Sequence, residues 1–173
     1  MAAHKEHLRV PLQILRKHNL FAKRSKCIFG VNEVDYLGHI ISGEGVSTFP
    51  SKVKAMLEWP VPKNVKELRG FLGLAGYYRK FIKAYGIISK PLTNLLRKNG
   101  FTCTEQATAA FKSLQAAMVK APVLALPNFS EQFEVETNAS GKGIGAVLSQ
   151  KGHPIAFISE ALSEKHLTLS TYE

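Results

Sequence analysis

Carboxylates are the side chains that most often hold catalytic metal ions, and this 173-residue chain has an unusual set of them. Of its 13 acidic residues twelve are glutamates, and the only aspartate is Asp35. Enzymes that hold paired Mg²⁺ for phosphoryl transfer place several carboxylates, often aspartates, around the metal ions. The chain has no aspartate pair to offer such a site.

Two smaller groups have the chemistry of metal ligands but not the spacing. His4 and His7 lie three residues apart in a predicted helix, and no further ligand follows at metal-binding spacing. Glu134 and Glu136 alternate with Val135 in a predicted strand, so both point to one face, and a solvated face is the favoured interpretation. The sequence therefore predicts no metal site.

Basic side chains outnumber acidic ones, with 23 Lys and Arg against 13 Asp and Glu, a net charge of +10 and a pI near 9.7. Residues 1–120 hold 20 basic and 7 acidic residues, whereas residues 121–173 hold 3 and 6. The hydrophobic content of 45 % is typical of a globular protein. A globular chain with such an excess of positive charge favours polyanionic partners, and nucleic acid is the expected class.

Apolar residues at three- and four-residue spacing predict that the middle of the chain is helical. Asn64 followed by Glu67 has the pattern of a capping box, and Ser89 and Thr104 are further predicted N-caps. Gly70, Gly73 and Gly76 form a smooth strip on one of these helices, where another backbone could approach closely, either for helix packing or for binding. The predicted helices span residues 4–18, 50–58, 64–82, 89–96 and 104–118.

Strands are predicted at both ends of this helical region. On the N-terminal side, residues 27–30 and 34–41 indicate two strands joined by a turn. On the C-terminal side, residues 133–137, 144–150 and 154–158 indicate three antiparallel strands. Prolines bracket the apolar segment 121–127, which is predicted to be an extended linker or edge segment and to mark the main domain boundary.

Nothing in the sequence indicates export or membrane insertion. The first residues lack the apolar core of a secretory signal, and no apolar run approaches the roughly 18 residues of a membrane span. Cys27 and Cys103 are far apart and have no Cys-x-x-Cys partner, so a reducing compartment is the default. We expect an intracellular protein, in the cytoplasm or nucleus, without a membrane partner.

Several motifs, in order, resemble one family. Tyr36-Leu37-Gly38-His39-Ile40-Ile41-Ser42, Trp59-Pro60-Val61-Pro62 and residues 68–82 resemble the reverse transcriptase region of the polyprotein of gypsy-class long-terminal-repeat retrotransposons. Thr137-Asn138-Ala139-Ser140 and residues 143–159 continue the resemblance into the RNase H domain. Nearly the whole chain is covered, and several motifs in register are far more specific than a lone pattern.

The resemblance implies an α+β fragment in three parts. Residues 1–48 would be the C-terminal hairpin part of the polymerase palm, residues 49–120 the helical thumb and connection, and residues 121–173 a truncated RNase H-like domain with three antiparallel strands. The family combines an RNA-directed DNA polymerase with an RNA/DNA-hybrid ribonuclease and uses Mg²⁺. Its polymerase motif, Tyr-x-Asp-Asp, lies upstream of this chain, and Asp35 does not match a catalytic residue.

The resemblance also implies that the ribonuclease site is damaged. Asn138 stands where the family has the metal-binding aspartate of Thr-Asp-Ala-Ser, and an amide lacks the negative charge that attracts divalent cations. The next metal-binding residue of the family, a glutamate, would fall two residues beyond Glu173. We therefore expect no intact catalytic or metal-binding residue and no catalysis by the chain alone.

Contacts with nucleic acid depend on other residues. The segment Tyr36, Leu37, Gly38 and His39 resembles the family's primer grip, although an ordinary hairpin that packs on the thumb is an equal alternative. Six basic residues are candidates for phosphate contacts with an RNA/DNA or DNA duplex, unless they form only a solvated face: Lys63, Lys66, Arg69, Arg79, Lys80 and Lys83.

Three functions follow from these observations. The first is a catalytically inactive reverse transcriptase and RNase H fragment. The second is a non-specific nucleic-acid-binding module, for which salt-dependent duplex binding is the distinguishing observation. The third is a non-catalytic partner of intact reverse transcriptase subunits, which would associate through an exposed sheet edge.

Overall fold

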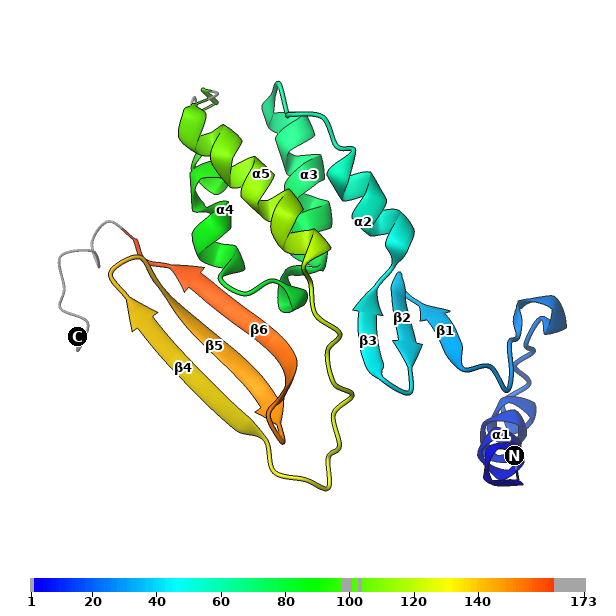
Figure 1. Ribbon diagram of the computed structural model, residues 1–173. Helices are drawn as coiled ribbons and strands as arrows, with labels where there is room; N and C mark the ends of the chain where they lie inside the picture. The colour runs from blue at the N-terminus through cyan, green and yellow to red at the C-terminus, as the bar shows by residue number, and fades with distance from the viewer. Residues whose placement is uncertain (1, 98–100, 103, 164–173) are drawn as a thin grey trace. The chain divides into compact units, whose positions relative to one another are not determined.

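The computed structural model describes residues 2–97, 101–102 and 104–163 (Figure 1). Cys103 and the terminal Glu173 lie outside the described residues. Contacts divide the chain into two compact units, residues 1–34 and residues 35–173. Within the described part no helix is long and apolar enough to cross a membrane. The predicted domain boundaries after residues 48 and 120 follow from the resemblance and stay predictions.

The first unit contains a helix and a short 3-10 turn. Helix α1 (Ala2–Lys17) confirms the predicted helix and continues through Pro11. After the helix, Asn19 has a left-handed φ of 53°, and the Leu20 N–H donates to the Leu15 carbonyl (2.9 Å). The 3-10 turn η1 (Arg24–Lys26) follows. The predicted strand over residues 27–30 is wrong, because this segment has no strand partner in the described chain and turns at Gly30 (φ 65°).

A three-stranded sheet joins β1 (Glu33–Tyr36), β2 (His39–Ser42) and β3 (Gly45–Thr48) in that order. The single strand predicted over residues 34–41 is therefore wrong. Leu37 and Gly38 have φ of 51° and 73°, the left-handed values of a two-residue hairpin turn. The strand-forming residues around Leu37 conceal this turn, because a left-handed conformation is unfavourable for leucine.

Helices form the middle of the second unit (Figure 1). Two predicted caps are confirmed, because Asn64 Oδ1 accepts from the Glu67 N–H (2.9 Å) and Thr104 Oγ1 accepts from the Ala107 N–H (3.1 Å). The elements are α2 (Pro50–Leu57), α3 (Val65–Tyr77), the 3-10 turn η2 (Arg79–Phe81), α4 (Tyr85–Asn94) and α5 (Glu105–Val119).

Two predicted helix boundaries are wrong. The helix predicted over residues 64–82 ends at Tyr77 and continues as the separate turn η2. Ser89 does not begin α4, since it lies buried inside that helix and its hydroxyl donates to the Gly86 carbonyl (3.3 Å). The helix starts earlier, after Ala84, which has a left-handed φ of 59°. No local sequence signal indicates that conformation for alanine.

The core lies where these helices meet. The rings of Phe71 and Phe111 are 4.4 Å apart, and the Gln115 side chain donates to the Met56 carbonyl at the end of α2 (2.9 Å). Such fully buried side chains supply most of the hydrophobic stabilisation of a domain. The largest of them are Tyr78, Phe71, Phe81, Met56, Leu68, Leu114, Met118 and Leu124.

The second sheet confirms the three predicted antiparallel strands and, with the helices, the α+β fold class. It has the order β4 (Glu134–Ser140), β5 (Gly143–Gln150) and β6 (His153–Ala161). Lys151 and Gly152, with φ of 50° and 74°, make the turn between β5 and β6. Strand β6 packs on α4, where the Gly86 N–H donates to Ser159 Oγ (2.8 Å).

The segment over residues 121–127 pairs with the edge of the first sheet, which agrees with the edge-segment alternative rather than with a simple linker. Leu124 is 1 % exposed, and it exchanges two backbone hydrogen bonds with Val46 of β3 (2.7 and 2.8 Å). The Ala125 N–H donates to the Pro154 carbonyl (2.8 Å). Residues 121–127 therefore tie the first sheet, the helices and the second sheet together.

Candidate nucleic-acid interface

The turn between β1 and β2 is fixed by two tyrosines from the end of α3. The Tyr77 hydroxyl donates to the Leu37 carbonyl (2.5 Å), and the Tyr78 hydroxyl donates to the Gly38 carbonyl (2.7 Å). Leu37 is 69 % exposed and has a left-handed backbone, which costs about 1 kcal/mol or more for a residue other than glycine. A strained, exposed side chain held on a rigid turn is suited to contact with a partner.

His39 packs beneath this turn among aromatic rings. Its imidazole stacks on Tyr77 (5.3 Å between centroids, 7° between planes) and also contacts Tyr78 and Phe81. Burial, and then the positive charge of Lys80, lowers the pKa of His39 below its ordinary value. The imidazole is therefore neutral at pH 7, and its buried Nδ1 has no hydrogen-bond partner among the described residues.

Helix α3 presents an exposed stripe beside the turn. Lys66, Arg69, Gly73 and Tyr77 recur at three- and four-residue spacing, and all four are exposed. A Cβ built at Gly73 would meet nothing within 4 Å. We name this surface, formed by Lys66, Arg69, Gly73, Tyr77 and the Leu37–Gly38 turn, the turn–α3 surface.

Of the three glycines predicted to allow close approach, only Gly73 faces open space. A Cβ at Gly70 would lie 3.3 Å from the ring of Trp59, and a Cβ at Gly76 would lie 3.4 Å from the Tyr85 hydroxyl. Gly70 and Gly76 therefore serve packing inside the chain. Gly73 alone leaves open space above the helix.

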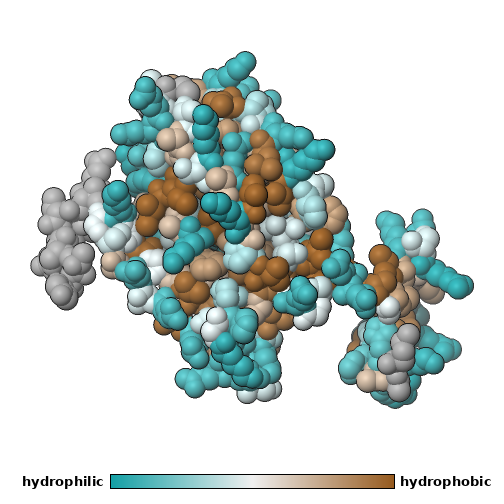
Figure 2. All heavy atoms as spheres, in the orientation of Figure 1, coloured by the Kyte–Doolittle hydropathy of each residue, from teal (hydrophilic) through white to brown (hydrophobic). Residues whose placement is uncertain are grey.

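The other predicted basic residues separate into different places. Lys63 precedes α3, and its backbone N–H donates to Glu67 Oε2 (2.8 Å). Lys80 Nζ lies over the ring of Phe81, 5.2 Å from its centroid. Arg79 lines a groove next to α4, and Lys83 lines a cavity next to β4. Hydrophilic side chains project around the helical part of the second unit, with hydrophobic patches between them (Figure 2).

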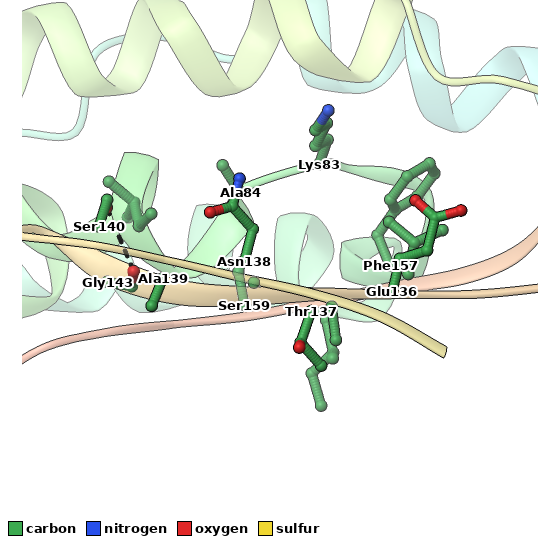
Figure 3. Close-up of a pocket in the computed structure, with 15 residues that line it drawn as sticks. Lys83, Ala84, Glu136, Thr137, Asn138, Ala139, Ser140, Gly143, Phe157 and Ser159 are labelled. Carbon is green, nitrogen blue, oxygen red and sulfur yellow. Dashed lines mark hydrogen bonds between the residues drawn. The ribbon is translucent and has the colours of Figure 1, made fainter. Parts of the chain in front are cut away.

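Asn138 lies in the middle of β4, opposite Gly145 of β5, which in turn lies opposite Ser159 of β6. Because Gly145 has no side chain, a cavity of about 360 Å³ opens over this row, toward Lys83 and the start of α4. Figure 3 shows Asn138 pointing toward Ala84, while Thr137 points to the other side of the sheet.

The residues around Asn138 do not fit a pair of divalent cations. Among the described residues that line the cavity, Glu136 supplies the only carboxylate, and it is exposed like Glu134; Lys83 adds a positive charge to the same lining. Across the described residues, no three His, Cys, Asp or Glu side chains lie close enough to hold a metal ion. Two-metal chemistry needs several carboxylates, so this site does not support it.

Sequence reasoning overlooked the residues that hold the turn and line the groove: Tyr77, Tyr85 and Lys90. One feature of the sequence indicates that Tyr77 lies on the same side of the helix as Gly73: it follows Gly73 by four residues, and both are exposed. The role of its hydroxyl depends on a residue forty positions away and has no local signal.

Comparison with known proteins identifies the chain more closely. Residues 103–173 match the family model described as an RNase H-like domain found in reverse transcriptase. An uncharacterized mitochondrial protein of Arabidopsis thaliana is 56 % identical over 129 residues, which cover 73 % of this chain and 82 % of that protein. The retrovirus-related Pol polyprotein from transposon 297 of Drosophila melanogaster is 41 % identical, covering 100 % of this chain and 16 % of the polyprotein.

The Pol polyprotein from transposon gypsy of Drosophila melanogaster is 38 % identical, covering 98 % of this chain and 18 % of that polyprotein. The chain thus spans less than a fifth of these transposon polyproteins.

Solved structures show the same fold. The foamy viral protease-reverse transcriptase dRH in complex with ds DNA superposes with a TM-score of 0.88 and 24 % identity, covering 99 % of this chain and 31 % of that chain. The foamy viral protease-reverse transcriptase in complex with RNA/DNA hybrid gives the same TM-score of 0.88, with 99 % and 24 % coverage. The family match and the relatives confirm the coarser part of the resemblance: the chain corresponds to the reverse transcriptase and RNase H-like region of retrotransposon Pol polyproteins.

Proposed function

We propose that this chain binds RNA/DNA or DNA duplexes without sequence preference, through the turn–α3 surface, and that it hydrolyses neither strand. The observation that carries the proposal is the rigid presentation of Leu37, whose carbonyl and that of Gly38 are held by the Tyr77 and Tyr78 hydroxyls. The role resembles that of the family's primer grip, but a turn rather than a strand presents the residues.

The chemistry of this surface suits a phosphate backbone. Lys66 and Arg69 are exposed on one side of α3, and the open space at Gly73 lets a backbone approach the helix closely. Lysine and arginine bind phosphates in any sequence, so they would position a duplex rather than read its bases. The similar solved structures of foamy viral reverse transcriptase contain ds DNA or an RNA/DNA hybrid, which supports this class of ligand.

Absence of hydrolysis follows from the residues around Asn138. In the intact family Mg²⁺ would be held by carboxylates, and here an amide occupies the position of the aspartate, beside Glu136 and Lys83. The similarity to transposon gypsy among the relatives also supports descent from a gypsy-class element.

One experiment tests binding and hydrolysis together. Fluorescence anisotropy with a labelled RNA/DNA hybrid should give an affinity that falls steeply with salt, and Mg²⁺ or Mn²⁺ should cause no cleavage. The double variant Lys66→Glu and Arg69→Glu should reduce the dependence of log K on log salt by about 1 for each phosphate that α3 no longer neutralises. The control variant Lys112→Glu, at an exposed position in α5, should leave this salt dependence unchanged. No binding at low ionic strength, or cleavage by the wild-type chain, would contradict the proposal.

A second function, association with intact reverse transcriptase subunits, is favoured by the second sheet. Strand β4 is an edge strand with all seven residues exposed. Val135, Ile144 and Ile158 are 65 %, 50 % and 70 % exposed, which is unusual for aliphatic side chains in a sheet. Co-purification with an intact reverse transcriptase, lost when Val135→Lys is introduced, would support this function; duplex binding without co-purification would contradict it.

A further inference from the structure

Strand β4 has a free edge. The second sheet has the order β4-β5-β6, and α4 packs on β6, at the opposite edge of the sheet (Figure 1). All seven residues of β4 are exposed, and none of the described segments pairs with the outer side of this strand. A free edge of this length is a template for another strand, and the residues along it determine which strand fits.

The turn after β4 shows which backbone groups face the free edge. Ser140 and Gly143 are paired across a two-residue turn, and such a closing pair exchanges both backbone hydrogen bonds. Hydrogen-bonded and non-hydrogen-bonded pairs alternate along an antiparallel ladder. The N–H and C=O groups of Val135, Thr137 and Ala139 therefore point away from β5, toward the free edge.

The sequence of β4 is complementary to itself when a second β4 runs antiparallel to it about Thr137. Opposed side chains in an antiparallel pair lie on the same face of the sheet. In this register apolar side chains oppose each other, and each glutamate opposes an uncharged polar side chain. The opposed pairs are Thr137 with Thr137, Val135 with Ala139, Glu136 with Asn138, and Glu134 with Ser140.

Charge favours this register over its neighbours. Like charges directly opposite each other destabilise an antiparallel pair, and a two-fold axis at Val135 or Glu136 would place glutamates opposite glutamates. An axis at Thr137 avoids these contacts and pairs all seven residues. It also brings Glu134 diagonally opposite the second copy's Lys142, within reach of a long side chain.

Asn138 has a specific part in this pairing. Its side chain and that of Glu136 line the same cavity, whereas Thr137 points to the other side of the sheet (Figure 3). The amide of Asn138 can donate a hydrogen bond to the second copy's Glu136, and the two-fold axis produces this pair twice. An aspartate at position 138 would instead oppose two carboxylates at both places.

We propose that β4 pairs antiparallel with β4 of a second copy of this chain, about a two-fold axis at Thr137, so that two three-stranded sheets form one six-stranded sheet. The inference goes beyond duplex binding and does not depend on it. It assigns the free edge to a second copy, because association with an intact reverse transcriptase would not use the self-complementary register.

Sedimentation velocity of the purified full chain tests the dimer. The wild type should form a reversible species of twice 19.1 kDa as its concentration rises toward the millimolar range. Asn138→Asp should raise the dissociation constant of the dimer about tenfold, because two like-charge pairs form, and the added change Glu136→Gln should restore it. Gln106→Glu, which also converts an exposed amide to a carboxylate but lies in α5, should leave the dissociation constant unchanged.

Amide hydrogen exchange tests the register directly. At concentrations where the dimer forms, the amides of Val135, Thr137 and Ala139 should gain protection relative to the dilute chain. The amides of Glu136 and Asn138, which face β5, should change little. This alternating pattern is measured on the wild type, so it does not require any variant to fold.

Thermal unfolding checks that each variant is folded before its dimerisation is compared. A wild-type chain that stays monomeric at every concentration overturns the proposal, as does a dimer without the alternating protection. An equal effect of Asn138→Asp and Gln106→Glu, or no restoration by Glu136→Gln, also overturns it. Fluorescence anisotropy with the labelled hybrid tests duplex binding separately, so failure of one proposal leaves the other standing.

Discussion

The imidazole of His39 lies flat against the ring of Tyr77, with 5.3 Å between centroids and 7° between planes, while the Tyr77 hydroxyl holds the carbonyl of Leu37. One tyrosine thus contacts both the first residue of β2 and the tip of the turn before it. The position of the turn is therefore coupled to the packing of a titratable side chain.

Stability should fall as pH drops through the range of histidine titration. Burial, and then Lys80, lowers the pKa of His39, so the unfolded chain takes up this proton first as pH falls below about 6.5. The free energy of unfolding should therefore decrease from there down to the lower pKa of the folded state. Urea unfolding between about pH 7.5 and about pH 5.5 measures the slope.

The control for this pH dependence removes the titrating group and keeps the ring. His39→Phe should flatten the slope. An unaltered slope in His39→Phe would show that other groups cause the pH dependence.

The two tyrosine hydroxyls should differ in their contribution to stability. Tyr78 is 1 % exposed, so Tyr78→Phe leaves the Gly38 carbonyl without its donor and should cost about 1–3 kcal/mol. Tyr77 is exposed, so Tyr77→Phe should cost about 1 kcal/mol or less, because water replaces the missing donor. Chemical denaturation of both variants tests the order; a larger destabilisation by Tyr77→Phe would contradict it.

Gly45 should tolerate no side chain. Its φ is 136°, and a Cβ would collide with the Leu124 carbonyl oxygen, where residues 121–127 pair with β3. Gly45→Ala should therefore lower the free energy of unfolding by about 3 kcal/mol or more. Gly30→Ala is the matched control, since it also has positive φ (65°) but open space around it. Equal destabilisation in both variants would assign the effect to φ alone.

Substitutions at Gly73 should affect the stability of the chain and its duplex binding differently. Because nothing lies within 4 Å of its Cβ position, Gly73→Ala should stabilise α3 by about 1 kcal/mol through helix propensity. Gly73→Leu should be similarly stable but should weaken duplex binding, since its side chain fills the open space on the turn–α3 surface. Unchanged affinity in Gly73→Leu, measured by anisotropy, would show that no duplex approaches the helix there.

Asn138→Asp tests how far the cavity over β4 is from metal binding. The variant places two carboxylates, at positions 136 and 138, on the face of β4 that lines the cavity. Mn²⁺ binding measured by calorimetry should increase, and it should increase further when Lys83→Ala removes the positive charge from the lining. Neither variant should cleave an RNA/DNA hybrid, because two-metal catalysis needs more carboxylates; cleavage by either would contradict this prediction.

Local signals were sufficient for much of the fold. The caps at Asn64 and Thr104 were predictable because each side chain bonds a backbone N–H three residues ahead. The three antiparallel strands of the second sheet were predictable from alternation and from the Lys151-Gly152 turn. The similarity to the reverse transcriptase and RNase H-like region was predictable because the motifs of that region keep their order and spacing.

Tertiary structure decided how the site is built. The Leu37–Gly38 turn interrupts a run of strand-forming residues, and it is stabilised by hydroxyls forty residues away. Leu124 is buried by a partner in β3, and the early start of α4 at Ala84 accompanies its packing against β6. The sequence by itself indicated most of the helices, the second sheet and the similarity to reverse transcriptases, because these depend on neighbouring residues. Contacts between distant segments determined the turn, the groove and the tie at Leu124.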